Sequence, residues 1–194
     1  MVGELFLSWR RPSKQQQQGC TTRAGGLNYN PTFHGASALD TRFFINRSRV
    51  LLGTGRKTYS LAKSALLSWT HFGLGWAFVD PETPVEKGRR FCVCVNEIMG
   101  CTMMPLQIAY VAKRRFGSGT LQGHLLAGEE RFSIVWDEDD QVWYEIFSFS
   151  KPAHIISAAG YPYVRLRQKY FAQQSADAVL KHVTAPQPNK SSDL

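Results

Sequence analysis

The chain has 194 residues, of which 43% are hydrophobic and 12% aromatic. A chain of this length usually forms one domain and buries roughly 70% of the surface that its unfolded form exposes, so it needs neither disulfides nor a structural metal to fold. The most apolar stretch, residues 61–79, is interrupted by Lys63, His71 and several other polar residues. This composition excludes a membrane-spanning helix of ~18 apolar residues.

The net charge is +8, from 23 basic and 15 acidic side chains. The basic residues are scattered in ones and twos, and an acidic run over 137–140 opposes them. This pattern is typical of a solvated basic surface, and we expect no nucleic-acid partner, while peripheral contact with an anionic membrane stays open. The four cysteines include no C-x-x-C pair, and Cys20 and Cys101 have no cysteine near them in the sequence. This spacing predicts reduced thiols in an intracellular compartment. We expect no metal site and no cofactor.

Residues 1–26 contain a glutamine run followed by Gly19, Gly25 and Gly26, which predict a flexible lead-in with one local turn around residues 6–9. The spacing of Tyr59, Ala62, Leu66 and Trp69 predicts an amphipathic helix over about 57–71. Short strands are expected next, over 76–79, 91–95 and 106–112.

Residues 132–136 and 142–149 flank an acidic loop of hairpin length, so we expect a β-hairpin there. The segment 162–183 predicts a long C-terminal helix with one apolar face, which comprises Tyr163, Leu166, Tyr170, Ala176, Leu180 and Val183. A single domain over 27–183 should then precede a disordered tail over 184–194. Adjacent strands without intervening helices predict the α+β class, with a curved antiparallel sheet around the last helix. By analogy this is a helix-grip arrangement, which leaves an apolar cavity between sheet and helix.

The glycine turn over 52–58 lacks the spacing of a phosphate-binding loop. It predicts the start of a helix, whose N-terminus beside Arg56 is an alternative site for an anion.

The segment 117–132 combines four glycines with His124, Glu129 and Glu130. One interpretation is a set of structural turns and ion pairs. The other is a ligand or catalytic site, in which a carboxylate orients the His124 imidazole for acid–base chemistry or Glu130 faces the cavity as a lone buried acid. On the following strand, Trp143, Glu145, Phe147 and Phe149 share one face, and Glu145 needs a partner such as Arg131.

Several blocks of the sequence resemble a family of uncharacterised plant and bacterial proteins, UPF0548. They are Asn28-Tyr29, Gly53-x-Gly55-Arg56, Trp69-x-x-Phe72-Gly73, Trp76–Asp80, Gly117–Phe132, Val142–Ile146, Ser148–His154 and Gly160–Tyr163, and the resemblance extends from about residue 5 to 183. The chain looks like a plant member. It departs from the family in the short segment 112–115, where a longer loop is expected.

The resemblance implies a layout similar to Bet v 1 and START-like proteins, and therefore a binder of an apolar or lipid-like small molecule. The expected ligand-binding residues are Arg56, Gly119, Thr120, His124, Glu130, Trp143, Phe147, Phe149, Tyr163 and Tyr170. One alternative is a cyclase- or hydrolase-type enzyme that uses His124 with Glu129 or Glu130. Another is an adaptor on the chloroplast outer envelope, a location that the resemblance suggests beside the cytoplasm.

Overall fold

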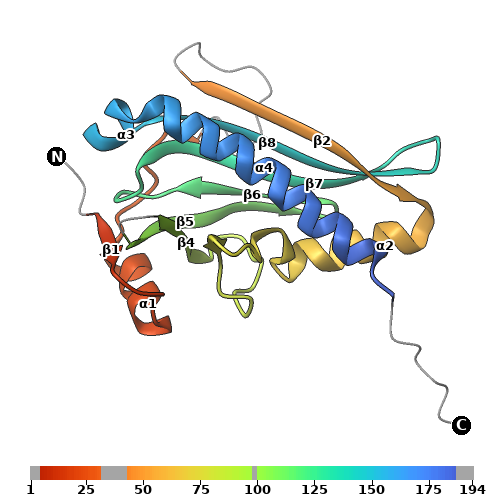
Figure 1. The fold of residues 1–194 in the computed structure, drawn as a ribbon, viewed down its shortest axis with the longest axis horizontal. Helices are drawn as coiled ribbons and strands as arrows, with labels where there is room; N and C mark the ends of the chain where they lie inside the picture. Colours follow the sequence, from red (N-terminus) through yellow and green to blue (C-terminus); the bar gives the residue numbers. More distant parts are fainter. Residues whose placement is uncertain (1–4, 32–42, 98–99, 187–194) are drawn as a thin grey trace, which may run out of the picture.

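The computed structural model describes residues 5–31, 43–97 and 100–186. A curved antiparallel sheet dominates the fold and is crossed by one long C-terminal helix (Figure 1). The strands are β1 (Phe6–Ser8), β2 (Phe44–Thr54), β3 (Ala77–Phe78), β4 (Arg90–Glu97), β5 (Gly100–Ala112), β6 (Arg115–Thr120), β7 (Leu126–Trp136) and β8 (Gln141–Pro152). The helices are α1 (Lys14–Arg23), α2 (Gly55–Leu67), the short 3₁₀ helix η2 (Thr70–Phe72), α3 (Ile155–Ala159) and α4 (Tyr161–Thr184).

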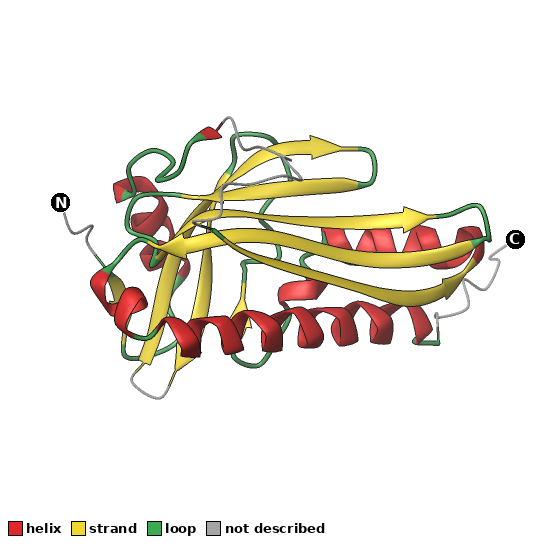
Figure 2. Cartoon of the chain, turned by 90° about the horizontal axis from the view of Figure 1, so that it is seen from above, coloured by secondary structure: helices red, strands yellow, loops and turns green. Residues whose placement is uncertain are grey.

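The strands form one sheet in the order β2-β8-β7-β6-β5-β4-β3, and β1 pairs with β5. Every strand pair is antiparallel. Figure 2 shows α4 running along the length of the sheet on one side. The predicted α+β class, with a curved antiparallel sheet and a long C-terminal helix, is confirmed.

The main core lies where α2 and the second half of α4 meet the sheet. Ala62, Ala65 and Leu66 of α2 pack in the same apolar cluster as Ala176 and Val179 of α4. Small side chains on both helices allow their backbones to approach, and the sheet contributes larger residues to the same cluster. This end of the molecule is therefore filled with side chains.

The helix predicted over 57–71 ends earlier, at Leu67. Trp69 takes a left-handed conformation with φ of 59°, which stops the helix and starts η2. The tertiary structure holds this conformation, because Trp69 is buried and its indole Nε1 donates to the Thr83 carbonyl at 2.7 Å. Helical periodicity alone does not reveal such a stop.

The N-terminal segment differs from the expected flexible lead-in over 1–26. Strand β1 pairs with β5, and α1 begins with a capping box between Ser13 and Gln16. Phe6 and Cys20 are buried in a second core cluster on the sheet. At the other end, α4 extends through Thr184, and residues 187–194 of the predicted tail lie outside the described residues.

Two hairpins organise the middle of the sheet. The predicted hairpin is confirmed as β7 and β8, which pair along their length around the acidic turn. The short segment 112–115 closes a tight β5–β6 hairpin, in which Ala112 pairs with Arg115. The β5–β6 pairing therefore extends up to this short turn, with one register shift between Ile108 and Tyr110. Within residues 5–31, 43–97 and 100–186, no helix has both the length and the apolar character needed to cross a membrane.

Candidate functional site: an internal cavity

A cavity of about 340 Å³ lies between the sheet and the first half of α4. Strands β4 to β8 form its floor, and α3, α4, Phe72 and Trp76 form the rest of its wall. Apolar side chains provide most of the lining: Phe72, Val93, Val95, Met104, Leu106, Leu125, Val164 and Phe171. Ile156 of α3 borders the cavity and is 58% exposed, so the cavity reaches the surface beside α3.

The cavity forms because the packing of α4 against the sheet differs between its two halves. In the second half of the helix, Ala176 and Val179 are fully buried in the core. In the first half, Val164 and Gln168 face the cavity, whereas Tyr163 and Leu166 are 54% and 66% exposed. The predicted apolar face is therefore wrong for this half, because here α4 covers a hollow rather than a packed core.

Glu130 faces this cavity from the middle of β7. Its neighbours across the sheet are Ser118 and Ser148, and these short residues leave space around the carboxyl group. Among the described residues, Glu130 has neither a hydrogen bond nor an ion pair. Loss of hydration raises the pKa of Glu130 from 4.5 to about 8. At neutral pH the group is therefore mostly protonated, and it can both donate and accept a hydrogen bond.

Glu129, in contrast to Glu130, has a hydrogen-bond partner. Its side chain is 4% exposed, and its Oε2 accepts a hydrogen bond of 3.0 Å from the Tyr29 hydroxyl. Burial, together with this negative charge, raises the pKa of Tyr29. Glu129 thus fits the interpretation of residues 117–132 as structural turns and paired side chains. Glu130 fits the other interpretation, in which a lone acid faces the cavity.

His124 lines the cavity near α3, but neither carboxylate contacts its ring. The His124 Nδ1 atom lies 2.9 Å from the Leu126 backbone nitrogen and 3.1 Å from the Leu126 carbonyl oxygen, so the backbone of this residue holds the ring in place. Burial lowers the pKa of His124 from 6.5 to about 4, so the imidazole is neutral at physiological pH. The expected carboxylate orientation of His124 is therefore wrong; the backbone of the β6–β7 loop fixes the ring instead.

Two further polar atoms in the cavity wall lack partners. The indole Nε1 of Trp76 and the amide Oε1 of Gln168 are buried without a hydrogen bond to any described residue. The Gln168 Nε2, in contrast, donates to Ser150 Oγ at 3.0 Å and so fixes the direction of the amide. One donor, one acceptor and the neutral Glu130 carboxyl thus border the same apolar space.

A charged pair closes the rim of the cavity. Arg167 forms an ion pair of 3.0 Å with Glu97, whose other oxygen accepts from the Tyr163 hydroxyl at 2.7 Å. Arg167 also lies 3.8 Å from the centre of the Trp76 ring. These contacts connect α4 to the end of β4 and hold the first half of the helix over the hollow.

Among the predicted binding residues, five border the cavity: Thr120, His124, Glu130, Phe149 and Tyr163. Thr120 is tied into the sheet, since its hydroxyl bonds both the N–H and the carbonyl of Gly128. Phe149 also packs edge-on against Tyr29.

The remaining predicted binding residues do not border the cavity. Trp143 donates to Asp137 and stacks on Arg49, and Phe147 packs beneath Arg131 on the outer face. Tyr170 is 44% exposed, and the space at Gly119 is taken by the Tyr29 ring. Strand β8 carries large apolar side chains on both faces, so its alternation does not indicate which face lines the cavity. The sequence-based prediction therefore assigned Trp143 and Phe147 to the wrong face of the sheet.

Glu145 also has a different partner from the one expected. It forms an ion pair with Arg49 at 3.2 Å, whereas Arg131 lies over the Phe147 ring. In the sheet register, Glu145 lies opposite Arg49 on β2 and Ser133 on β7, which is why Arg131 is offset from it.

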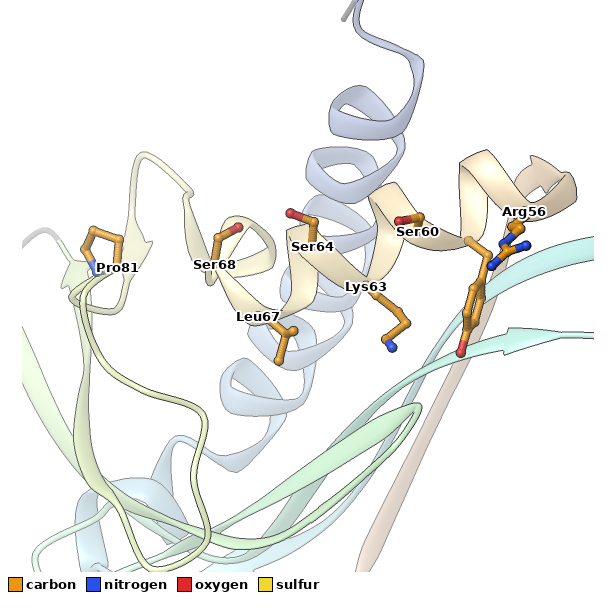
Figure 3. Close-up of a pocket in the computed structure, with 8 residues that line it drawn as sticks. Arg56, Ser60, Lys63, Ser64, Leu67, Ser68 and Pro81 are labelled. Atoms are coloured by element: carbon orange, nitrogen blue, oxygen red, sulfur yellow. The ribbon is translucent and has the colours of Figure 1, made fainter.

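Arg56 lies on a separate, open groove beside α2. Figure 3 shows Arg56, Ser60 and Lys63 along the helix, with Pro81 at the far end of the groove. At the start of the helix, the Gly55 N–H is already bonded to the Asp140 carbonyl at 3.0 Å. The glycine turn therefore begins a helix, as its sequence predicts, and Arg56 is no part of the cavity.

Sequence reasoning missed Trp76, Gln168 and Arg167. A signal for Gln168 exists, because it lies four residues after Val164 and three before Phe171, on a helix face that is otherwise apolar. For Trp76 and Arg167, no sequence pattern indicates that they lie at the cavity; only the tertiary structure shows it. Within the described ranges, no group of three or more His, Cys, Asp or Glu side chains is arranged to hold a metal ion.

An antiparallel sheet curved around a C-terminal helix, with a cavity between them, defines a helix-grip protein. Residues 29–178 match the family described as Domain of unknown function (DUF1990). The chain is 52% identical to a UPF0548 protein of Arabidopsis thaliana, over 93% of this chain and 99% of the relative. It is 31% identical to a UPF0548 protein of Dictyostelium discoideum, with 76% of each chain covered. The chain therefore belongs to the UPF0548 family.

A solved structure supports the fold assignment. Truncated norcoclaurine synthase from Thalictrum flavum is similar with a TM-score of 0.53, over 78% of this chain and 100% of that one. The two sequences are only 10% identical, so this likeness concerns the fold alone.

Proposed function

We propose that this protein binds a small, mainly apolar molecule that carries a hydrogen-bonding group, in the cavity beneath α4. The observation that carries the proposal is Glu130, an acid without a partner inside an apolar hollow of about 340 Å³. Natural proteins rarely leave a buried polar group unsatisfied unless it has a function. A ligand group that accepts from Glu130, or donates to it, supplies the missing partner.

The charge state of the cavity favours an uncharged ligand. Near pH 7, Glu130 is mostly protonated and His124 is neutral, while Arg167 at the rim is paired with Glu97. Trp76 offers a donor and Gln168 an acceptor, so a hydroxyl or carbonyl group on an apolar skeleton fits this wall. Among the described residues that line the cavity, the one Lys or Arg side chain is Arg167, and its charge is already paired with Glu97.

A neutral fluorescent probe, N-phenyl-1-naphthylamine, tests the cavity directly. Val164→Trp places a large side chain in the hollow, whereas Leu166→Trp adds the same indole on the exposed side of the same helix. We expect Val164→Trp to abolish the increase in probe fluorescence and Leu166→Trp to keep it, with similar melting temperatures. Equal probe binding by both variants contradicts the proposal. Native mass spectrometry of the purified protein then looks for a retained small molecule.

A cyclase- or hydrolase-type catalytic role is the second candidate, and one observation favours it. The pKa of Glu130 of about 8 lies near physiological pH, as suits a general acid, and His124 borders the same space. Glu130→Gln separates the two roles: it should keep probe binding in both cases, but it abolishes turnover of a candidate substrate only if the carboxyl transfers a proton.

The exposed side chains beside the cavity opening favour contact with a membrane, which the net charge of the protein neither supports nor excludes. Ile155 and Ile156 of α3 are 74% and 58% exposed beside the opening. We propose that these side chains touch a membrane surface from which an apolar ligand enters. Flotation with phosphatidylcholine vesicles tests this: Ile155→Ser with Ile156→Ser should reduce vesicle binding, and Leu67→Ser on α2 should not. Equal binding by all three proteins contradicts it.

A further inference from the structure

The fold brings all four cysteines together, although they are far apart in the sequence. Cys20 comes from α1, Cys92 and Cys94 from β4, and Cys101 from β5, and all belong to the second core cluster. Cys20 and Cys101, which have no cysteine near them in the sequence, are thus brought to Cys92 and Cys94 by the fold. In the pairing of β4 with β5, Cys101 lies opposite Asn96, two residues from Cys94 and on the same face of the sheet, and α1 packs on the same two strands.

This thiol cluster lies on the other side of the sheet from the cavity. Along β4, Val93 and Val95 line the cavity, and the alternation of the strand directs Cys92 and Cys94 to the opposite face. The Cys92 and Cys20 Sγ atoms are 3.5 Å apart, and those of Cys92 and Cys94 are 3.9 Å apart. The four thiols are thus a separate feature, which the proposed binding function does not use.

Helix α1 depends on this cluster for its place on the sheet. Its sequence is polar throughout except for Cys20, its one buried residue. Several of its other contacts are polar: Lys14 pairs with Asp80 and Glu82, and Arg90 donates to the carbonyls of Thr21 and Ala24; Arg23 also lies over the Phe6 ring. An element with so little buried apolar surface opens locally at low cost, and opening gives a dissolved oxidant access to the thiols.

We propose that Cys20 and Cys92 are a modification site: a redox-sensitive thiol pair that forms a reversible disulfide on reaction with a peroxide. In the first step, one thiol attacks a peroxide oxygen, the O–O bond breaks, and a sulfenic acid and water form when the oxidant is hydrogen peroxide. In the second step, the other thiol attacks the sulfenic sulfur, the S–S bond forms, and a second water leaves. The two thiols lose two electrons and two hydrogens in total, and the peroxide is reduced to two water molecules.

The geometry selects Cys20 as the partner of Cys92. The Cys20 thiol approaches Cys92 more closely than Cys94 does, and it comes from another element that can adjust its position. Cys94 is fixed two residues further along the same strand, where a bond to Cys92 would distort the backbone. The disulfide would attach α1 covalently to β4, so peroxide would convert a weakly held helix into a fixed one.

Tryptic mapping of the full-length protein tests the pair. The reduced protein is treated with hydrogen peroxide, blocked with iodoacetamide and digested without reductant. Cleavage at basic residues places Cys20 in peptide 15–23 and the other three cysteines in peptide 91–113. We expect the two peptides to be linked, and fragmentation of the linked species to place the bond at Cys92. Dithiothreitol should separate them.

Variants and an unfolded control make the result decisive. Cys92→Ser should abolish the link, while Cys101→Ser, which also replaces a buried thiol of the cluster, should retain it. Fragmentation of the wild-type peptides gives the same assignment if a variant fails to fold. A bond from Cys20 to Cys94 or Cys101 overturns the proposal. So does a folded protein that stays unlinked at a peroxide concentration that cross-links the chain in urea.

Discussion

Replacement of Glu130 by glutamine should change how the stability of the protein depends on pH. The carboxyl group has a pKa of about 8 in the folded protein and 4.5 when hydrated. Between these two values the folded state holds a proton that the unfolded state releases. The free energy of unfolding therefore falls as pH rises through this window, because ionisation favours the unfolded chain. Glutamine does not titrate, and Glu130→Gln should lack this fall.

The size of the effect follows from the two pKa values. Each pKa unit corresponds to about 1.4 kcal/mol, so the full window from 4.5 to about 8 sets an upper limit of about 5 kcal/mol. Water that enters the cavity screens the ionised group, and the protein relaxes around it. We therefore expect Glu130→Gln to gain about 1–3 kcal/mol relative to the wild type between pH 4.5 and pH 8.5.

Urea unfolding followed by circular dichroism at several pH values measures this difference. Contributions from the histidines are common to both proteins and cancel in the subtraction. Glu145→Gln is the matched control for the loss of a carboxylate, because Glu145 lies on β8 outside the cavity, is partly exposed and forms an ion pair with Arg49. A constant difference between wild type and Glu130→Gln across the range would show that Glu130 is ionised in the folded protein, and would refute the reasoning.

Two further predictions concern the packed part of the molecule. His71 is completely buried, neither ring nitrogen has a partner among the described residues, and burial lowers its pKa to about 3. The wild type should therefore lose stability as pH falls from 6.5 towards 3, and His71→Leu should lose less, as urea unfolding at pH 7 and pH 5 will show; parallel losses contradict this. Gly128→Ala should cost about 2 kcal/mol or more in thermal or urea unfolding, because a Cβ there would lie 1.9 Å from the Phe149 carbonyl oxygen; a cost below about 0.5 kcal/mol would contradict this close approach.

Local sequence patterns predict the elements of this fold better than they predict its faces. The β7–β8 hairpin follows from alternation around an acidic loop, and the long last helix from its spacing and its flanking prolines. Helix α1 has no apolar periodicity, because its one contact with the core is Cys20. A local signal was nevertheless present: Ser13 followed three residues later by Gln16 is a capping box, although no apolar run follows it.

The candidate site was predictable only in part, for a physical reason. Two consecutive carboxylates on a strand point to opposite faces, so one of Glu129 and Glu130 is expected on the face that α4 covers. Which strand face is concave depends on how the whole sheet curves, and that is a property of all the strand pairs together. Trp143 and Phe147 are as apolar as cavity residues, yet they cover the outer face, beneath Arg49 and Arg131. Composition does not distinguish the two faces of such a strand.

The two ends of α4 differ in what they contact: one packs in the core and the other covers the cavity. Ala176 and Val179 make the close contacts that hold the helix on the sheet, so the first half need not be tightly packed. There the helix is held by a polar clamp at the rim, from Arg167 to Glu97, together with hydrogen bonds from Tyr161 and Gln168 to Ser150. Loss of this clamp should therefore loosen the cover of the cavity without unfolding the protein. The cavity and its lone carboxyl group lower stability, and the packed end of the same helix offsets that cost.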